Sequence, residues 1–169
     1  AGRLTITVEN STGGSGNTRT TRYIYTDDNG LKRLISDNPD TGSQVTIWTR
    51  GVTTSQGSRI NSNRLVYQKT LPGGDTATYL YNRQSQATGM SDPAGTVHAY
   101  SFDKLGRPVA DTVTAFGADI DTTVGRLTTG YNERGLVIRS TSLNPAGSVV
   151  INEVKSAYNA FNQFVTGWQ

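Results

Sequence analysis

Short runs in which apolar or aromatic residues alternate with polar ones recur along the chain, the pattern typical of half-buried β-strands. The clearest runs cover residues 4–8, 22–25, 45–48, 65–67, 77–81, 97–102, 109–113, 136–138 and 149–154. Glycine, proline or an Asn-Gly or Asp-Pro pair interrupts most windows long enough for an amphipathic helix. The sequence therefore predicts an all-β protein with little or no helix.

Turn sequences built on proline and glycine separate many of these runs. Four of them cover residues 38–42, 71–74, 92–95 and 144–147. Proline presets φ at one central turn position, and glycine accepts positive φ near the end of the turn. Such regular punctuation favours antiparallel hairpins.

One segment also fits a helix. Val154, Ala157, Tyr158, Phe161 and Phe164 have helical spacing. We nevertheless predict a strand pair over residues 154–164, because the aromatic positions there follow the repeat described next.

A repeat emerges when aromatic residues followed by Asn or Asp are aligned. The pairs are Tyr81-Asn82, Phe102-Asp103, Tyr131-Asn132 and Tyr158-Asn159. Four residues after each aromatic residue stand Ser85, Gly106, Gly135 and Asn162, types that accept positive φ. Tyr25 fits the same frame with Gly30 one residue late, and Trp48 marks a degenerate unit before Tyr81. Each unit thus reads as a hairpin followed by a Pro/Gly turn.

The repeats predict the domain organisation. We expect one array over residues 1–169 with about five to six hairpin units, in which residues 1–20 form a partial N-terminal unit with a Gly/Ser-rich loop at 13–16. A single hairpin cannot bury its aromatic face alone, so the units must order themselves by lying side by side. The expected partners are flanking repeats of a longer chain or other copies of the same chain.

Segments 99–108, 130–137 and 22–37 closely resemble the Tyr-Asp repeat of the RHS/YD-repeat family, in which an aromatic-Asp pair precedes Gly-Arg-Leu. The resemblance covers most of residues 20–169 in a divergent form. It implies a β-solenoid or spiral sheet of hairpins, found in bacterial secreted toxins, where it forms a hollow cocoon, and in cell-surface proteins. The repeat-motif residues, all structural, would be Tyr25, Gly30, Tyr81, Phe102, Asp103, Gly106, Tyr131, Gly135 and Tyr158. Some members carry a self-cleaving segment with a catalytic Asp, but residues 92–95 resemble an ordinary turn.

Composition narrows the function classes. The chain has 169 residues, no cysteine and a net charge of +3 without a long basic run. Cysteine-based catalysis, thiolate metal sites and disulfides are therefore excluded, and nucleic acid is not an expected partner. No apolar run is long enough to span a membrane. We expect no cofactor and no metal.

Residues that suggest chemistry also have simpler explanations. His98 is the only histidine and lies at the same strand parity as Tyr100 and Phe102, so we expect it to pack rather than to catalyse. Residues 27–30 resemble a calcium loop but lack its later glutamate, and we interpret them as a turn in which Gly30 supplies positive φ. Residues 10–12 form a formal glycosylation sequon.

These observations predict a non-catalytic structural segment of a secreted or cell-surface protein, part of a shell or scaffold. Two alternatives stay open. The chain could be a self-associating extracellular fibre subunit joined through open sheet edges, or a carbohydrate-binding adhesin module in which Trp48, Trp168 and the tyrosines stack on sugars.

Overall fold

The computed structural model describes residues 5–10, 18–38 and 42–169, which fall into two compact units, 1–86 and 87–169. The described part of the first unit contains six strands and a short 3-10 helix. They are β1 (Ile6–Asn10), β2 (Thr18–Tyr25), β3 (Leu31–Asn38), β4 (Gly42–Val52), η1 (Thr54–Gln56), β5 (Ser62–Thr70) and β6 (Thr76–Tyr81). Each strand pairs with the next one along the chain, and every pairing is antiparallel.

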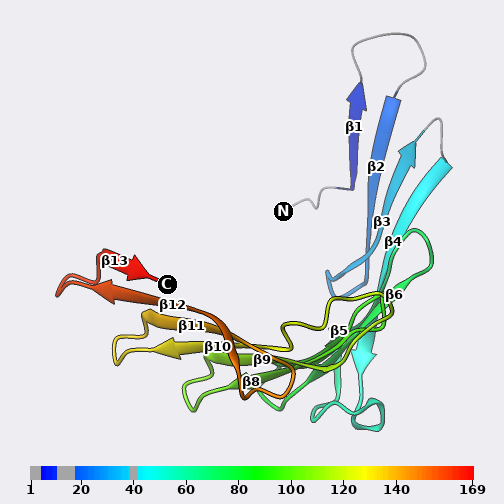
Figure 1. Ribbon diagram of the computed structural model, residues 1–169. Helices are drawn as coiled ribbons and strands as arrows, with labels where there is room; N and C mark the ends of the chain where they lie inside the picture. The colour runs from blue at the N-terminus through cyan, green and yellow to red at the C-terminus, as the bar shows by residue number, and fades with distance from the viewer. Residues whose placement is uncertain (1–4, 11–17, 39–41) are drawn as a thin grey trace. The chain divides into compact units, whose positions relative to one another are not determined.

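The second unit has the same plan with seven strands. They are β7 (Ala87–Ser91), β8 (Val97–Phe102), β9 (Pro108–Ala115), β10 (Arg126–Tyr131), β11 (Val137–Leu143), β12 (Val150–Tyr158) and β13 (Phe164–Trp168). Again each strand pairs with its sequence neighbour in antiparallel fashion (Figure 1). The predicted all-β hairpin fold is therefore confirmed.

The strand pair predicted at residues 154–164 is also present. β12 ends at Tyr158, a turn follows, and β13 begins at Phe164. The helical spacing was misleading because Asn162 adopts a φ of 64°, which a right-handed helix does not allow. The predicted strand at 45–48 is too short, since β4 runs from Gly42 to Val52.

Very few side chains are buried. Among the described residues the buried hydrophobic side chains are Ile35, Val52, Ala77 and Ala110, and only Val52 is almost completely covered, at 1% exposure. Hairpins laid side by side form one layer, so each face meets solvent instead of a second layer. Order must then come from strand pairing, cross-strand contacts and turns.

The degenerate unit expected at Trp48 departs from the others. β4 continues past Trp48 to Val52, and a longer connection, 53–61, leads to β5. The Gln56 side chain accepts a hydrogen bond from the Thr53 amide at 2.8 Å, which closes η1. The connection then joins β6, because Tyr81 N donates to Ser58 Oγ at 3.1 Å and Arg59 N donates to Tyr81 O at 2.7 Å.

Several predicted features lie outside the described residues. They are the loop at 13–16, most of the partial unit at 1–20, the centre of the turn at 38–42, and two of the three sequon residues. The prediction of one continuous array over 1–169 stays a prediction.

Candidate functional site

Five turns that follow an aromatic strand end share one geometry. In each, the amide of the first turn residue donates to the carbonyl of the fifth at 2.8–3.0 Å. The donor–acceptor pairs are Thr26–Gly30, Asn82–Gln86, Asp103–Arg107, Asn132–Leu136 and Asn159–Gln163. We call these the motif turns, since they are the turns that the sequence repeat marks.

A left-handed residue occupies the fourth place of every motif turn. These residues are Asn29, Ser85, Gly106, Gly135 and Asn162, with φ between 64° and 82°. The interpretation of Gly30 as the positive-φ residue is wrong, because Asn29 holds that place with a φ of 68°. Asparagine tolerates this conformation. The left-handed residue of this unit therefore stands four residues after Tyr25, the same spacing as in the other units.

Gly30 is required for a different reason. A Cβ atom there would lie 2.5 Å from Nε of Arg50. The Arg50 guanidinium is held in place because it donates to the carbonyl oxygens of Leu31 and Arg64, on the two strands that flank β4. Glycine is therefore the residue type that lets this guanidinium pass beneath the turn.

Asn or Asp at the first turn place binds the turn's own backbone. Asp103 Oδ1 accepts from the amides of Leu105 and Arg107 at 2.9 and 3.0 Å. Asn82, Asn132 and Asn159 make the same two bonds. The hydrogen bond from the Arg107 amide is the main cause that lowers the pKa of Asp103. The Asx preference of the repeat thus has a local explanation.

The strand register repeats as well. The aromatic residue before a motif turn pairs with the residue six places later, in Tyr25–Leu31, Phe102–Pro108, Tyr131–Val137 and Tyr158–Phe164. The pairing before it is shifted by one residue, which leaves an extra residue on the second strand. This β-bulge was not foreseen, because alternating polar and apolar residues carry no mark of an insertion.

Tyrosine hydroxyls connect successive hairpins. Tyr131 Oη donates to Pro108 O at 2.8 Å, and Tyr158 Oη donates to Val137 O at 3.0 Å. In both cases the acceptor is the residue directly after the preceding motif turn. Tyr81 Oη makes a comparable bond to Val66 O on β5 at 2.9 Å. Phe102 occupies the equivalent strand position without a hydroxyl, so it packs without this link.

A charged contact adds a second link. Arg107 Nε donates to Asp103 Oδ2 at 2.7 Å, and the Arg107 guanidinium lies over the Tyr131 ring at 4.4 Å from its centroid. Asp103 therefore orients the cation that stacks on the next motif tyrosine. We call this contact between Asp103, Arg107 and Tyr131 the arginine clasp. The Gly-Arg pair in the sequence was its only signal.

Arg134 makes the corresponding link to the last motif turn with different chemistry. Its Nη1 donates to the carbonyl oxygens of Asn159 and Ala160 and to Asn162 Oδ1, at 3.1–3.2 Å. One guanidinium thus spans from one motif turn to the next. The sequence did not point to Arg134, because the residue type at the third place of the motif turns is not constant; it is Asp28 in the first turn and Phe161 in the last.

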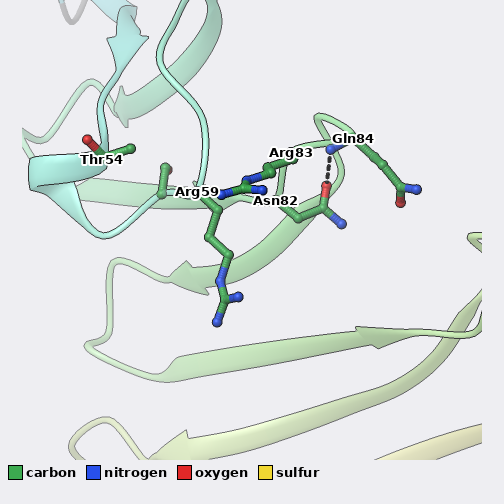
Figure 2. Close-up of a pocket in the computed structure, with 6 residues that line it drawn as sticks. Thr54, Arg59, Asn82, Arg83 and Gln84 are labelled. Carbon is green, nitrogen blue, oxygen red and sulfur yellow. Dashed lines mark hydrogen bonds between the residues drawn. The ribbon is translucent and has the colours of Figure 1, made fainter.

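An open hollow lies beside η1 in the first unit. It has a volume of about 690 Å³ and is lined by Thr54, Ser58, Arg59, Asn82, Arg83 and Gln84. Figure 2 shows the bond by which Asn82 holds the Gln84 amide, with both arginine side chains close by. The two guanidinium groups suit an anionic group, but their exposure to water makes the electrostatic attraction weak.

His98 lies where its strand parity predicts. Its ring stacks with that of Tyr100 at 6.1 Å between centroids, and its Nδ1 is 2.8 Å from Asp111 Oδ1. In the part of the chain that the structure describes, no three His, Cys, Asp or Glu side chains gather as a metal site. No helix among the described residues is long and apolar enough to cross a membrane.

Comparison with known proteins gives a consistent picture of the fold. No family model matches the chain, and no curated protein matches it. Among solved structures, a TcdB2-TccC3 structure without its hypervariable C-terminal region matches 90% of this chain at 14% identity, with a TM-score of 0.64. The TcdB2-TccC3-Cdc42 crystal structure matches 90% at 13% identity, with a TM-score of 0.62. The chain shares its fold with a segment of these proteins.

A Photorhabdus luminescens Tc holotoxin pore structure also matches, with 96% of this chain covered at 12% identity and a TM-score of 0.50. The chain spans only 7% of the length of the two TcdB2-TccC3 chains and 9% of the holotoxin chain. The likeness therefore concerns a hairpin-repeat segment of large proteins, and it concerns the fold rather than an activity.

Proposed function

We propose that the chain is a non-catalytic structural segment of a secreted or cell-surface YD-repeat protein, in which it forms part of a shell or scaffold. The observation that carries the proposal is the set of links between successive motif turns. A hydroxyl bond, the arginine clasp and the Arg134 bridge each tie one hairpin to the next. The polar groups in these links bind neighbouring hairpins, so their hydrogen-bond donors and acceptors are occupied within the sheet. Such groups serve a structural role and are not available to a ligand.

The fold likeness supports the same function. One of the similar structures is named as a Tc holotoxin pore, and the matched segments are small parts of long chains. A segment of repeated hairpins adds length to a sheet without adding a reaction centre. Flanking repeats are therefore the partners we propose.

Electron microscopy of the protein encoded by the complete gene tests the shell assignment. We expect discrete hollow particles in wild type. A variant with Arg107→Ala, Tyr131→Phe and Arg134→Ala should give broken or protease-sensitive particles, whereas Lys104→Ala should not. Particles that stay intact in the triple variant would contradict the proposal that these links build the wall.

A fibre subunit is the second candidate, because one segment favours self-association. Residues 156–169 contain no charged residue, and Phe161, Phe164 and Trp168 in it are exposed. Uncharged aromatic strands readily pair with other chains. Filaments in the same micrographs, lost on Val165→Lys, would favour this candidate over the shell.

The absence of catalysis is tested separately. A hydrolase screen against peptide, ester and glycoside substrates should give no turnover above buffer. Turnover that His98→Ala abolishes would refute the non-catalytic assignment.

A further inference from the structure

The only histidine and the only methionine of the chain face each other across two strands. Met90 on β7 is the direct register partner of His98 on β8. Directly opposed residues in an antiparallel pair point to the same face, with Cβ atoms about 4.5–5.5 Å apart. The flexible methionine side chain can therefore bring its sulfur against the imidazole.

Asp111 on β9 sets the orientation of the imidazole. Because a carboxylate oxygen only accepts hydrogen bonds, the 2.8 Å contact between Asp111 Oδ1 and His98 Nδ1 favours the tautomer that carries its proton on Nδ1. The lone pair then belongs to Nε2. Metal-binding histidines are usually held in this way, with the second ring N–H donated to a carboxylate.

Tyr100 completes the cluster. It stands two residues after His98 on β8, hence on the same face, and its ring stacks with the imidazole. Its hydroxyl lies 4.0 Å from Met90 Sδ. A thioether sulfur has two lone pairs, so one remains for another partner. The four side chains are half-buried, which limits competition from water.

We propose that His98 Nε2 and Met90 Sδ bind a soft monovalent metal ion, Cu(I) in the first place. Thioether and imidazole ligands select Cu(I), whereas Mg²⁺ and Ca²⁺ require oxygen ligands. The nearby Asp111 carboxylate balances the single positive charge of the ion. Because β7 and β8 each supply one ligand, the bound ion would stabilise the pairing of these two strands.

Titration with Ag(I), a redox-inert stand-in, and with Cu(I) under reducing, oxygen-free conditions tests the site. The chain offers a single methionine methyl resonance and a single imidazole, so nuclear magnetic resonance reports both ligands without ambiguity. Both signals should shift together and saturate at one equivalent of metal. Bound metal should also raise the unfolding midpoint, because it binds the folded state.

Matched variants separate ligation from folding. Met90→Leu conserves volume and should abolish binding, and His98→Gln should do the same. Asp111→Asn should weaken affinity roughly 10- to 100-fold, as expected when a partner of a ligand is altered. Ser91→Ala, on the opposite face of β7, should bind like wild type.

Two outcomes would overturn the proposal. One is an imidazole or methyl signal that does not move at one equivalent of Ag(I). The other is binding that survives Met90→Leu in a protein whose metal-free unfolding midpoint equals that of wild type. Neither outcome depends on the shell assignment, because binding is measured on the chain alone.

Discussion

The two units are built from the same kind of hairpin, but different contacts stabilise each of them. Among the described side chains, unit 1–86 contains three of the four buried hydrophobic ones, and only Ile6 and Ile24 in it are large, apolar and exposed. Unit 87–169 contains one buried hydrophobic side chain, Ala110, and exposes twelve large ones. Both units have links between hairpins, but only the first adds a small core to them.

Charge separates the units in the same way. The first carries ten Lys and Arg against six Asp and Glu, and the second carries six against seven. Charge repulsion opposes association more strongly for the first unit than for the nearly neutral second one. A hairpin repeat can therefore be stabilised by burial or by contacts to its neighbours, without a change of topology.

Val52 tests how much the core of the first unit contributes to its stability. Val52→Ala should lower the free energy of unfolding by about 2.5 kcal/mol, because two buried methyl groups are lost and a cavity remains. Trp48 fluorescence during urea denaturation, in a Trp168→Phe background, would measure it. Val150→Ala, at an exposed site of the second unit and followed through Trp168 in a Trp48→Phe background, should change stability by less than about 0.5 kcal/mol. Equal costs would erase the contrast between the units.

A second prediction concerns close backbone packing in the second unit. A Cβ on Gly117 would collide with the carbonyl oxygen of Ala94, so Gly117→Ala should cost about 2 kcal/mol. Gly73→Ala in the first unit meets only an ordinary contact and should be nearly neutral. Urea denaturation in the same single-tryptophan backgrounds would report both. If Gly117→Ala left the free energy of unfolding unchanged, the connection between β9 and β10 would have to shift at no cost to make room for the Cβ atom.

The arginine clasp should have a smaller effect. Arg107→Ala should cost about 1 kcal/mol, and a double-mutant cycle with Tyr131→Leu should give a coupling of about 0.5–1 kcal/mol. Arg107→Lys should recover only part of it, since an ammonium lacks the planar fork that fits both partners. Lys104→Ala in the same turn is the control. A coupling near zero would mean that stacking contributes nothing to the link.

The smallest effect is pH-dependent. Hydrogen bonds from Lys155 and then Arg139, both 2.7 Å long, lower the pKa of Glu153 to about 2. A lowered pKa means that this stabilisation is present above about pH 4.5 and is lost as the pH falls toward 2. Glu153→Gln should therefore destabilise the second unit at pH 7 and match wild type near pH 2, in thermal melts followed at Trp168. Glu133→Gln, in an exposed turn, should show no such convergence.

Local turn chemistry made most of the fold predictable. The Asx residues and the left-handed places at Gly106 and Gly135 are visible in the sequence because few residue types satisfy them. Alternation alone did not mark strands β7 and β10, because small and polar residues such as Gly89 and Thr128 obscure it; only the repeat implied them, as halves of hairpins. Arg50 and Arg134 escaped because their partners are backbone carbonyls distant in sequence, which no local pattern encodes.

The extra residue after each motif turn has a consequence for how such a protein can evolve. A β-bulge bends its strand and increases the local right-handed twist. Val109, Ile138 and Val165 supply this insertion at the same place in three hairpins. We therefore expect these hairpins to contribute similar increments of twist. Whole hairpins can then be gained by duplication or lost by deletion while the curvature per hairpin is preserved. The side chains between the insertions can be substituted without changing that curvature. Deletion of a single residue at one of these places would instead straighten that hairpin and interrupt the series.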